Sequence, residues 1–255
     1  MDHAKILGWA DRQLEALEAA VNAYTALKPY RITSQYEGIA EQGVVRIREG
    51  PNALLPDELT FRTGDVLHNM RVSLDYLVSS IVRKHSPQTD ESRVAFPICP
   101  KAGNFPSVAG MRLKGAPATC VQMIEGFQPE KGWNPEWAHP LLLLDGLENL
   151  HKHRRLLATG VALTDFKYVV IAAPSTLIGM AGGQVPSGPL EDGAEVARFT
   201  RLDTASAEAR VEFRATFHVC FDKAGPARGL ILLRTLKQIR DYIRQIIFPS
   251  LESFL

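Results

Sequence analysis

The chain has 255 residues, of which 45% are hydrophobic and 22% charged, so it has a globular composition and enough length for a sizeable core. Lys and Arg total 29 against 28 Asp and Glu, and a net charge of +1 excludes an overall attraction to nucleic acid or acidic membranes. The three cysteines are odd in number and contain no CxxC pair, which argues against a disulfide framework and a structural zinc site.

The first residues, MDHAKILGWADRQLEALEAA, have neither the basic start nor the unbroken apolar core of a signal peptide. No apolar run approaches the roughly 20 residues that a membrane-spanning helix needs. We therefore expect a cytoplasmic protein with no membrane contact.

The first half of the chain predicts two long helices separated by strands. Residues 2–27 have apolar side chains at helical spacing, and Lys28-Pro29 ends this amphipathic pattern. Apolar and basic residues then alternate within 30–49, which indicates short strands before the break at Gly50-Pro51. A continuous apolar stripe follows over 57–84 and predicts a core helix.

The second half predicts a long connection, a third helix, a β-rich segment and a fourth helix. Residues 86–137 are rich in Pro and Gly and predict an ordered connection with one or two short helices near 121–125. Leucines mark a core helix over about 140–158, with Gly160 as its stop. Alternation predicts β structure within 166–222, and apolar residues at four and three spacing predict the last helix over about 228–248.

These elements predict one α+β domain over residues 1–255. We expect a predominantly antiparallel four-helix bundle, with a small antiparallel β-sheet insertion packed on one side and the Pro/Gly-rich connection over one end.

A first polar cluster lies on the predicted helix 57–84. Because successive helical residues turn by roughly 100°, His68, Arg71 and Asp75 fall within one narrow band. The carboxylate could orient the imidazole, and the arginine could hold a phosphate. We assign these three residues as candidate catalytic residues and neighbouring Asn69 as a ligand-binding residue. The alternative is an ordinary ion pair between Arg71 and Asp75, with His68 solvated.

A second polar cluster covers residues 148–155 of the third predicted helix. Arg154 lies within the leucine stripe, so it must meet either a carboxylate of a neighbouring helix or a ligand anion. We assign His153 as a further candidate catalytic residue, and Lys152 and Arg154 as ligand-binding residues. His151 and His153 are two residues apart, unlike the i, i+4 pair of a zinc helix, so we expect no metal or cofactor.

The last predicted helix carries a basic stripe of Lys237, Arg240 and Arg244 at three and four spacing. Such a stripe can hold a phosphate backbone, and its commoner alternative is a solvated helix face.

Two blocks, GDVLHNMRVSLDYLV and LENLHKHRRLL, resemble a group of uncharacterised bacterial proteins that carry LHNLRSALDH-like and DKHR-like blocks. More loosely, the first block resembles the HEPN domains, helical bundles whose members are often metal-independent RNA-cleaving toxins or defence proteins. This resemblance implies Arg71 as the HEPN arginine, RNA as the partner, a role in defence or stress response, and a homodimer. The HEPN histidine position falls on Tyr76, and Arg62 with His68 also satisfies the spacing.

Three functional hypotheses follow. The first is a HEPN-like RNA-binding or RNA-cleaving protein in which Arg71 and Arg154 hold a phosphate, His68 or His153 handles the proton, and Asp75 orients the imidazole. The second is a non-enzymatic binding or assembly protein whose polar clusters are bridges between helices. The third is a metal-dependent hydrolase on a histidine-bearing bundle.

Overall fold

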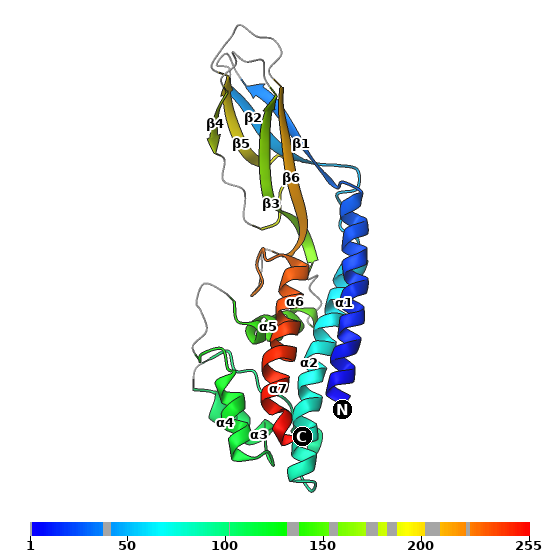
Figure 1. The fold of residues 1–255 in the computed structure, drawn as a ribbon, viewed down its shortest axis with the longest axis vertical. Helices are drawn as coiled ribbons and strands as arrows, with labels where there is room; N and C mark the ends of the chain where they lie inside the picture. Colours follow the sequence, from blue (N-terminus) through cyan, green and yellow to red (C-terminus); the bar gives the residue numbers. More distant parts are fainter. Residues whose placement is uncertain are drawn as a thin grey trace.

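The computed structural model describes residues 2–37, 42–101, 103–131, 138–152, 158–171, 178–182, 188–201, 210–222 and 225–255. The molecule is elongated, with long helices at one end and β-strands at the other (Figure 1). The mixed α+β class expected from the sequence is confirmed, with two small antiparallel sheets in place of the single one predicted.

Helices α1 (Asp2–Ala26) and α2 (Asp57–His85) run antiparallel and pack along their length (Figure 1). Their bounds lie close to the predicted 2–27 and 57–84. Helix α2 has acidic residues in its first turn and basic residues in its last turn, an arrangement that favours the helix dipole. Its apolar stripe is fully buried, so one side of α2 belongs to the core while the other remains available for a site.

Helix α5 (Pro140–Lys152) lies across α2. It begins at a histidine cap, since the backbone N–H of Leu141 donates to Nδ1 of His139 at 3.1 Å. The predicted end at 158 is wrong, because Ala158 already starts strand β3. Gly160 belongs to that strand, where Pro189 packs so closely that a Cβ would lie 2.5 Å from its ring.

The last helical segment comprises α6 (Leu232–Tyr242), a π turn (Ile243–Ile247) and α7 (Phe248–Leu251). It begins after the predicted residue 228. The residues before it form a turn in which Gly225 and Gly229 have positive φ, and Ile231 makes a β-bridge to Cys220.

The larger sheet has the order β1-β2-β5-β4 and is antiparallel throughout. Its strands are β1 (Tyr30–Glu37), β2 (Gln42–Glu49), β4 (Ile178–Gly182) and β5 (Glu195–Arg201). The second sheet pairs β3 (Ala158–Ile171) with β6 (Arg210–Phe221). Strand β3 begins well before the predicted residue 166.

The connection between α2 and α5 is largely ordered and holds a 3₁₀ turn (Glu91–Arg93), α3 (Phe105–Arg112) and α4 (Ala118–Gly126). Figure 1 shows α3 and α4 beside the end of α2 where the chain also terminates. Phe96, Phe105 and Ile124 are buried, so this connection is part of the core. Within the described part of the chain, no helix has the length and apolar character to cross a membrane.

Candidate functional site

A pocket of about 500 Å³ opens between α2, α5 and the connection, and we call it the α2 pocket. Helix α2 contributes His68, Arg71, Val72 and Asp75, and α5 contributes Glu148. The opposite wall contains Arg93, Val94 and Met111 together with Arg112. The first predicted cluster therefore lines a solvent-accessible space, as its band on the helix suggested.

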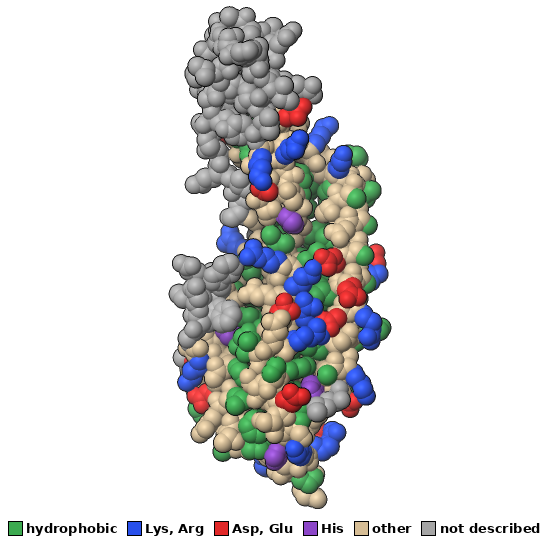
Figure 2. Space-filling view, in the orientation of Figure 1, with side chains coloured by type: hydrophobic (Ala, Val, Ile, Leu, Met, Phe, Trp, Pro, Cys, Tyr) green, Lys and Arg blue, Asp and Glu red, His purple; other side chains and the backbone are tan. Residues whose placement is uncertain are grey.

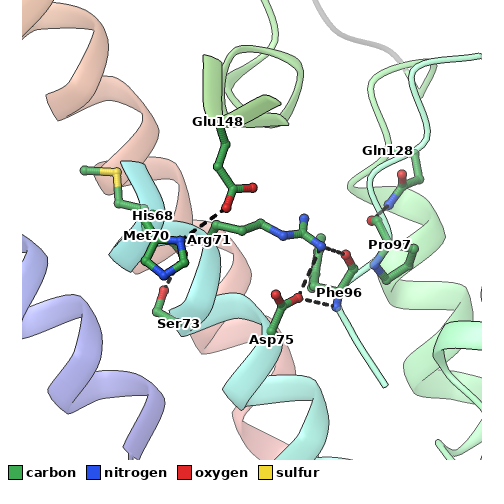
Figure 3. A network of polar contacts seen from close by, with 9 residues as sticks. All are labelled: His68, Met70, Arg71, Ser73, Asp75, Phe96, Pro97, Gln128 and Glu148. Carbon is green, nitrogen blue, oxygen red and sulfur yellow. Dashed lines mark hydrogen bonds and ion pairs between the residues drawn. The ribbon is translucent and has the colours of Figure 1, made fainter. Parts of the chain in front are cut away.

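Arg71 is the most buried cation of the α2 pocket, with 7% of its surface exposed. Its Nη2 donates to the carbonyl oxygen of Phe96 at 2.6 Å and lies 3.2 Å from Oδ1 of Asp75 (Figure 3). Its Nη1 is also buried and has no hydrogen-bond partner among the described residues. A buried guanidinium nitrogen without a partner costs free energy unless a ligand supplies an acceptor.

Asp75 is used differently from the prediction. Its Oδ1 accepts a hydrogen bond from the backbone N–H of Phe96 at 2.8 Å, so it holds the connection rather than the imidazole. Burial raises the pKa of this carboxyl, against the opposing effects of Arg71 and the Phe96 N–H. Asp75 and Arg71 together clamp both polar backbone groups of Phe96.

The carboxylate beside the imidazole is Glu148. Its Oε1 lies 3.4 Å from Nδ1 of His68, with 6% of the Glu148 side chain and 57% of the His68 side chain exposed (Figure 3). Glu148 was not predicted in this role, because its contact with His68 joins two helices that are far apart in the sequence. The missed signal is its position seven residues after Leu141 and four after Leu144, which places it on the buried face of α5.

Gln128 fixes the other side of the connection and was also missed. It is buried, and its Nε2 donates to the carbonyl oxygens of Pro97 at 3.1 Å and Ile124 at 3.0 Å. Its Oε1 accepts from the backbone N–H of Cys99 at 2.9 Å. The segment 96–99 is thus held from both sides, so one wall of the α2 pocket is fixed without a ligand.

Three predicted residues cannot be placed in the site, since the side chain of Lys152 and all of His153 and Arg154 lie outside the described residues. Asn69 faces α1: its Nδ2 donates to Oε1 of Gln13 at 2.9 Å and to the carbonyl oxygen of Asp65 at 2.8 Å. Asn69 therefore serves the α1–α2 contact, and its assignment to ligand binding stays a prediction.

The alternative HEPN pairing within α2 has little support. Arg62 forms an ion pair with Glu58 at 2.6 Å, one turn earlier on the helix. Tyr76, at the implied histidine position, is 48% exposed. The imidazole that shares the α2 pocket with Arg71 is thus His68, which precedes the arginine in the chain.

The basic stripe of the last helix is paired with acids of α1. Lys237 meets Glu18 at 2.7 Å, Arg240 meets Asp11 at 3.1 Å, and Arg244 also donates to Asp11. Figure 2 shows basic and acidic side chains interspersed over these helices. The stripe holds α6 against α1, which leaves little net charge there for a phosphate backbone.

The remaining groups that could form a second reactive centre in the described ranges are metal-ligating side chains and thiols. Among the described residues, no group of three or more His, Cys, Asp or Glu side chains is arranged to hold a metal ion. Burial raises the pKa of Cys120 to about 11 and that of Cys220, next to Asp222, to about 12. These thiols stay protonated near neutral pH and are poor nucleophiles.

Comparison with known proteins adds no assignment: no protein-family description, curated protein or solved structure shows a significant match to this chain.

Proposed function

We propose that the protein binds RNA at the α2 pocket and cleaves it without a metal ion, in the manner of the HEPN ribonucleases. One observation carries the proposal: the His68–Glu148 pair and the unpartnered Nη1 of Arg71 belong to the same pocket of about 500 Å³. That volume lies within the range of small-molecule sites and suits a nucleotide unit.

In the proposed reaction, the phosphodiester lies against Nη1 of Arg71, with Arg112 at the opposite wall. His68 accepts the proton of the ribose 2′-hydroxyl, whose oxygen attacks phosphorus. The bond from phosphorus to the 5′ oxygen breaks, the leaving oxygen takes a proton from solvent, and a 2′,3′-cyclic phosphate remains. Glu148 orients the imidazole and stabilises its protonated form, while Asp75 positions Arg71.

We further propose that α1, α2, α5 and α6 form the antiparallel four-helix bundle that the resemblance implies. Contacts of α1 with α2 and α6, and of α5 with α2 and α6, support this arrangement. A homodimer and a role in defence or stress response stay predictions.

The test is cleavage of a labelled RNA by purified protein in excess EDTA. We expect cyclic-phosphate ends, and a loss of about 100-fold or more in rate for His68→Gln, because a positioned general base contributes that much. Arg62→Gln is the matched control, since it removes a polar group from the same helix outside the pocket. RNA left intact by wild-type protein under these conditions would exclude the reaction.

A second candidate is a non-enzymatic protein in which the cluster is a structural clamp. The observation that favours it is that Arg71 and Asp75 both bond to the backbone of Phe96. His68→Gln separates the two candidates, because His68 is outside this clamp. A clamp alone predicts that this variant leaves any RNA affinity unchanged.

A further inference from the structure

The α2 pocket adjoins a second hollow, which we call the outer pocket. The outer pocket has a volume of about 940 Å³ and lies along residues 86–93 and the end of α3. Ser92, Arg93 and Met111 line both hollows, so the two adjoin along these side chains, and we call them together the groove. A ligand bound at Arg71 therefore has the outer pocket as its neighbour on the side away from the His68–Glu148 pair.

Basic side chains line both hollows. Arg112 lies in the α2 pocket, Arg93 at the junction and Lys114 in the outer pocket. All three are exposed, and no side-chain hydrogen bond or ion pair joins them to the described residues. These cations form no direct ion pair within the described residues, unlike the basic stripe of α6, although the charge of Arg93 lowers the pKa of Asp90 and that of Arg112 acts in the same sense on Asp75.

The acids beside these cations are already engaged. Both carboxylate oxygens of Asp90 accept hydrogen bonds from Ser92, one from its N–H and one from its hydroxyl, each at 2.9 Å. Glu91 accepts from Nε of Arg83 at 2.9 Å and from the hydroxyl of Ser79. The 3₁₀ turn thus directs its carboxylates to its own backbone and to α2.

An apolar surface lines the same hollows as the cations. Met111 is 54% exposed although it is a large hydrophobic residue, and it lines both hollows. Val94 adds to this surface on the α2 pocket side. A polarizable thioether can pack against the face of a nucleobase of any sequence.

We propose that the groove binds a single-stranded oligonucleotide across two phosphate subsites. One phosphate lies at Arg71 and Arg112, a neighbouring phosphate lies at Arg93 and Lys114, and a base packs on Met111 between them. This rests on the proposed function, and it makes the ligand an oligonucleotide rather than a mononucleotide. A concave groove with both cationic and apolar positions matches one strand, whose bases are free to leave the stack.

The experiment is calorimetric titration of full-length protein with 2′-O-methyladenosine 3′-monophosphate and with the corresponding tetranucleotide, neither of which has a 2′-hydroxyl to react. We expect the tetranucleotide to bind at least about 10-fold more tightly at low salt. Arg93→Ala/Lys114→Ala should reduce this affinity to near that of the mononucleotide and leave mononucleotide binding unchanged. The salt slope for the tetranucleotide should fall by about 0.7 for each phosphate that the variant no longer neutralises.

The matched control is Lys5→Ala/Lys167→Ala, which removes two charges at exposed ion pairs away from the groove and should leave both affinities unchanged. Equal affinity of the two ligands, or equal weakening of both by the groove variant, overturns the two-subsite proposal while the proposed function stands. Absence of binding by both ligands overturns the proposal and the function on which it rests.

Discussion

Two arginine–aspartate centres of this protein contain the same chemical groups, but the pKa of the aspartate is lowered in one and raised in the other. Between α6 and α1, Asp11 accepts from both Arg240 and Arg244. Burial alone would raise the pKa of Asp11, but these hydrogen bonds and charges lower it. On α2, Asp75 faces Arg71 and one backbone N–H, and burial raises its pKa. In the first centre one carboxylate bonds to two guanidinium groups, whereas in the second a buried guanidinium nitrogen has no partner within the part of the chain that the structure describes.

The difference shows which kind of arginine is available to a ligand. A carboxylate that receives two guanidinium groups fixes two helices and leaves little charge to recruit an anion. An arginine that shares its carboxylate with a backbone amide keeps an unused N–H donor. Because that donor is buried, a ligand that accepts a hydrogen bond from it gains more free energy than it would at an exposed arginine. Four predictions test this contrast.

The largest effect is expected for Arg71→Met. The Phe96 carbonyl loses its donor and the partly buried Asp75 loses its cation, so the free energy of unfolding should fall by about 3 kcal/mol. Urea denaturation measures this change. Arg62→Met, at an exposed pair on the same helix, should cost less than about 1 kcal/mol. Equal stability of the two variants would show that Arg71 does not clamp the connection.

The next effect is expected for Asp11→Ala. It leaves Arg240, whose side chain is 20% exposed, facing α1 without that carboxylate, and should cost about 2 kcal/mol in urea denaturation. Asp2→Ala breaks a pair that is exposed on both sides and serves as the control, with a cost below about 1 kcal/mol. A cost for Asp11→Ala as small as the control's would place the α6 pairs among ordinary surface contacts.

Opposite pH dependences should follow from the two carboxyls. The folded-state pKa of Asp75 lies above 3.8, so its contribution to stability falls as pH rises from 3.8 through that raised value. The folded-state pKa of Asp11 lies below 3.8, so its contribution is present above 3.8 and is lost as pH falls through the lowered value.

The measurement is the difference in stability between wild-type protein and Asp75→Asn, and between wild-type protein and Asp11→Asn, across acidic pH. The two difference curves should slope in opposite directions. Curves that slope in the same direction would show that the folded-state pKa values of Asp75 and Asp11 are shifted in the same direction, which contradicts the contrast between the two centres.

The smallest effect is expected for Arg244→Ala. Its side chain is 43% exposed and Asp11 keeps Arg240, so thermal unfolding should reveal a loss below about 1 kcal/mol. A loss as large as that for Asp11→Ala would mean that Arg244 alone supports the pairing.

Local periodicity predicted the side of the site that belongs to one helix. Residues three and four apart share a helix face, so His68, Arg71 and Asp75 could be grouped from the sequence alone. Their partners could not be identified in this way, because Glu148 and Phe96 reach them through tertiary packing. The contact of Asn69 with Gln13 could not be predicted for the same reason, since Gln13 is on another helix.

The predicted ends of helices and strands were wrong where the local sequence fits more than one structure. Gly160 has the local sequence context of a helix stop, yet it is a strand residue that makes room for Pro189. The alternation predicted β structure within 166–222, but not the pairing of β6 with β3 or the division into two sheets. Pairing depends on residues distant in the chain, which a short window of sequence does not contain.

Gly64 sets the distance at which α2 and α5 cross. A Cβ at this position would lie 2.1 Å from Cε1 of His151, so the imidazole ring rests directly on the backbone of α2. His68 is one turn beyond Gly64, and Glu148 is one turn before His151. The same crossing therefore sets the distance between the Glu148 carboxylate and the His68 imidazole. A methyl group added at Gly64 would displace the His151 ring and with it the helix that carries Glu148.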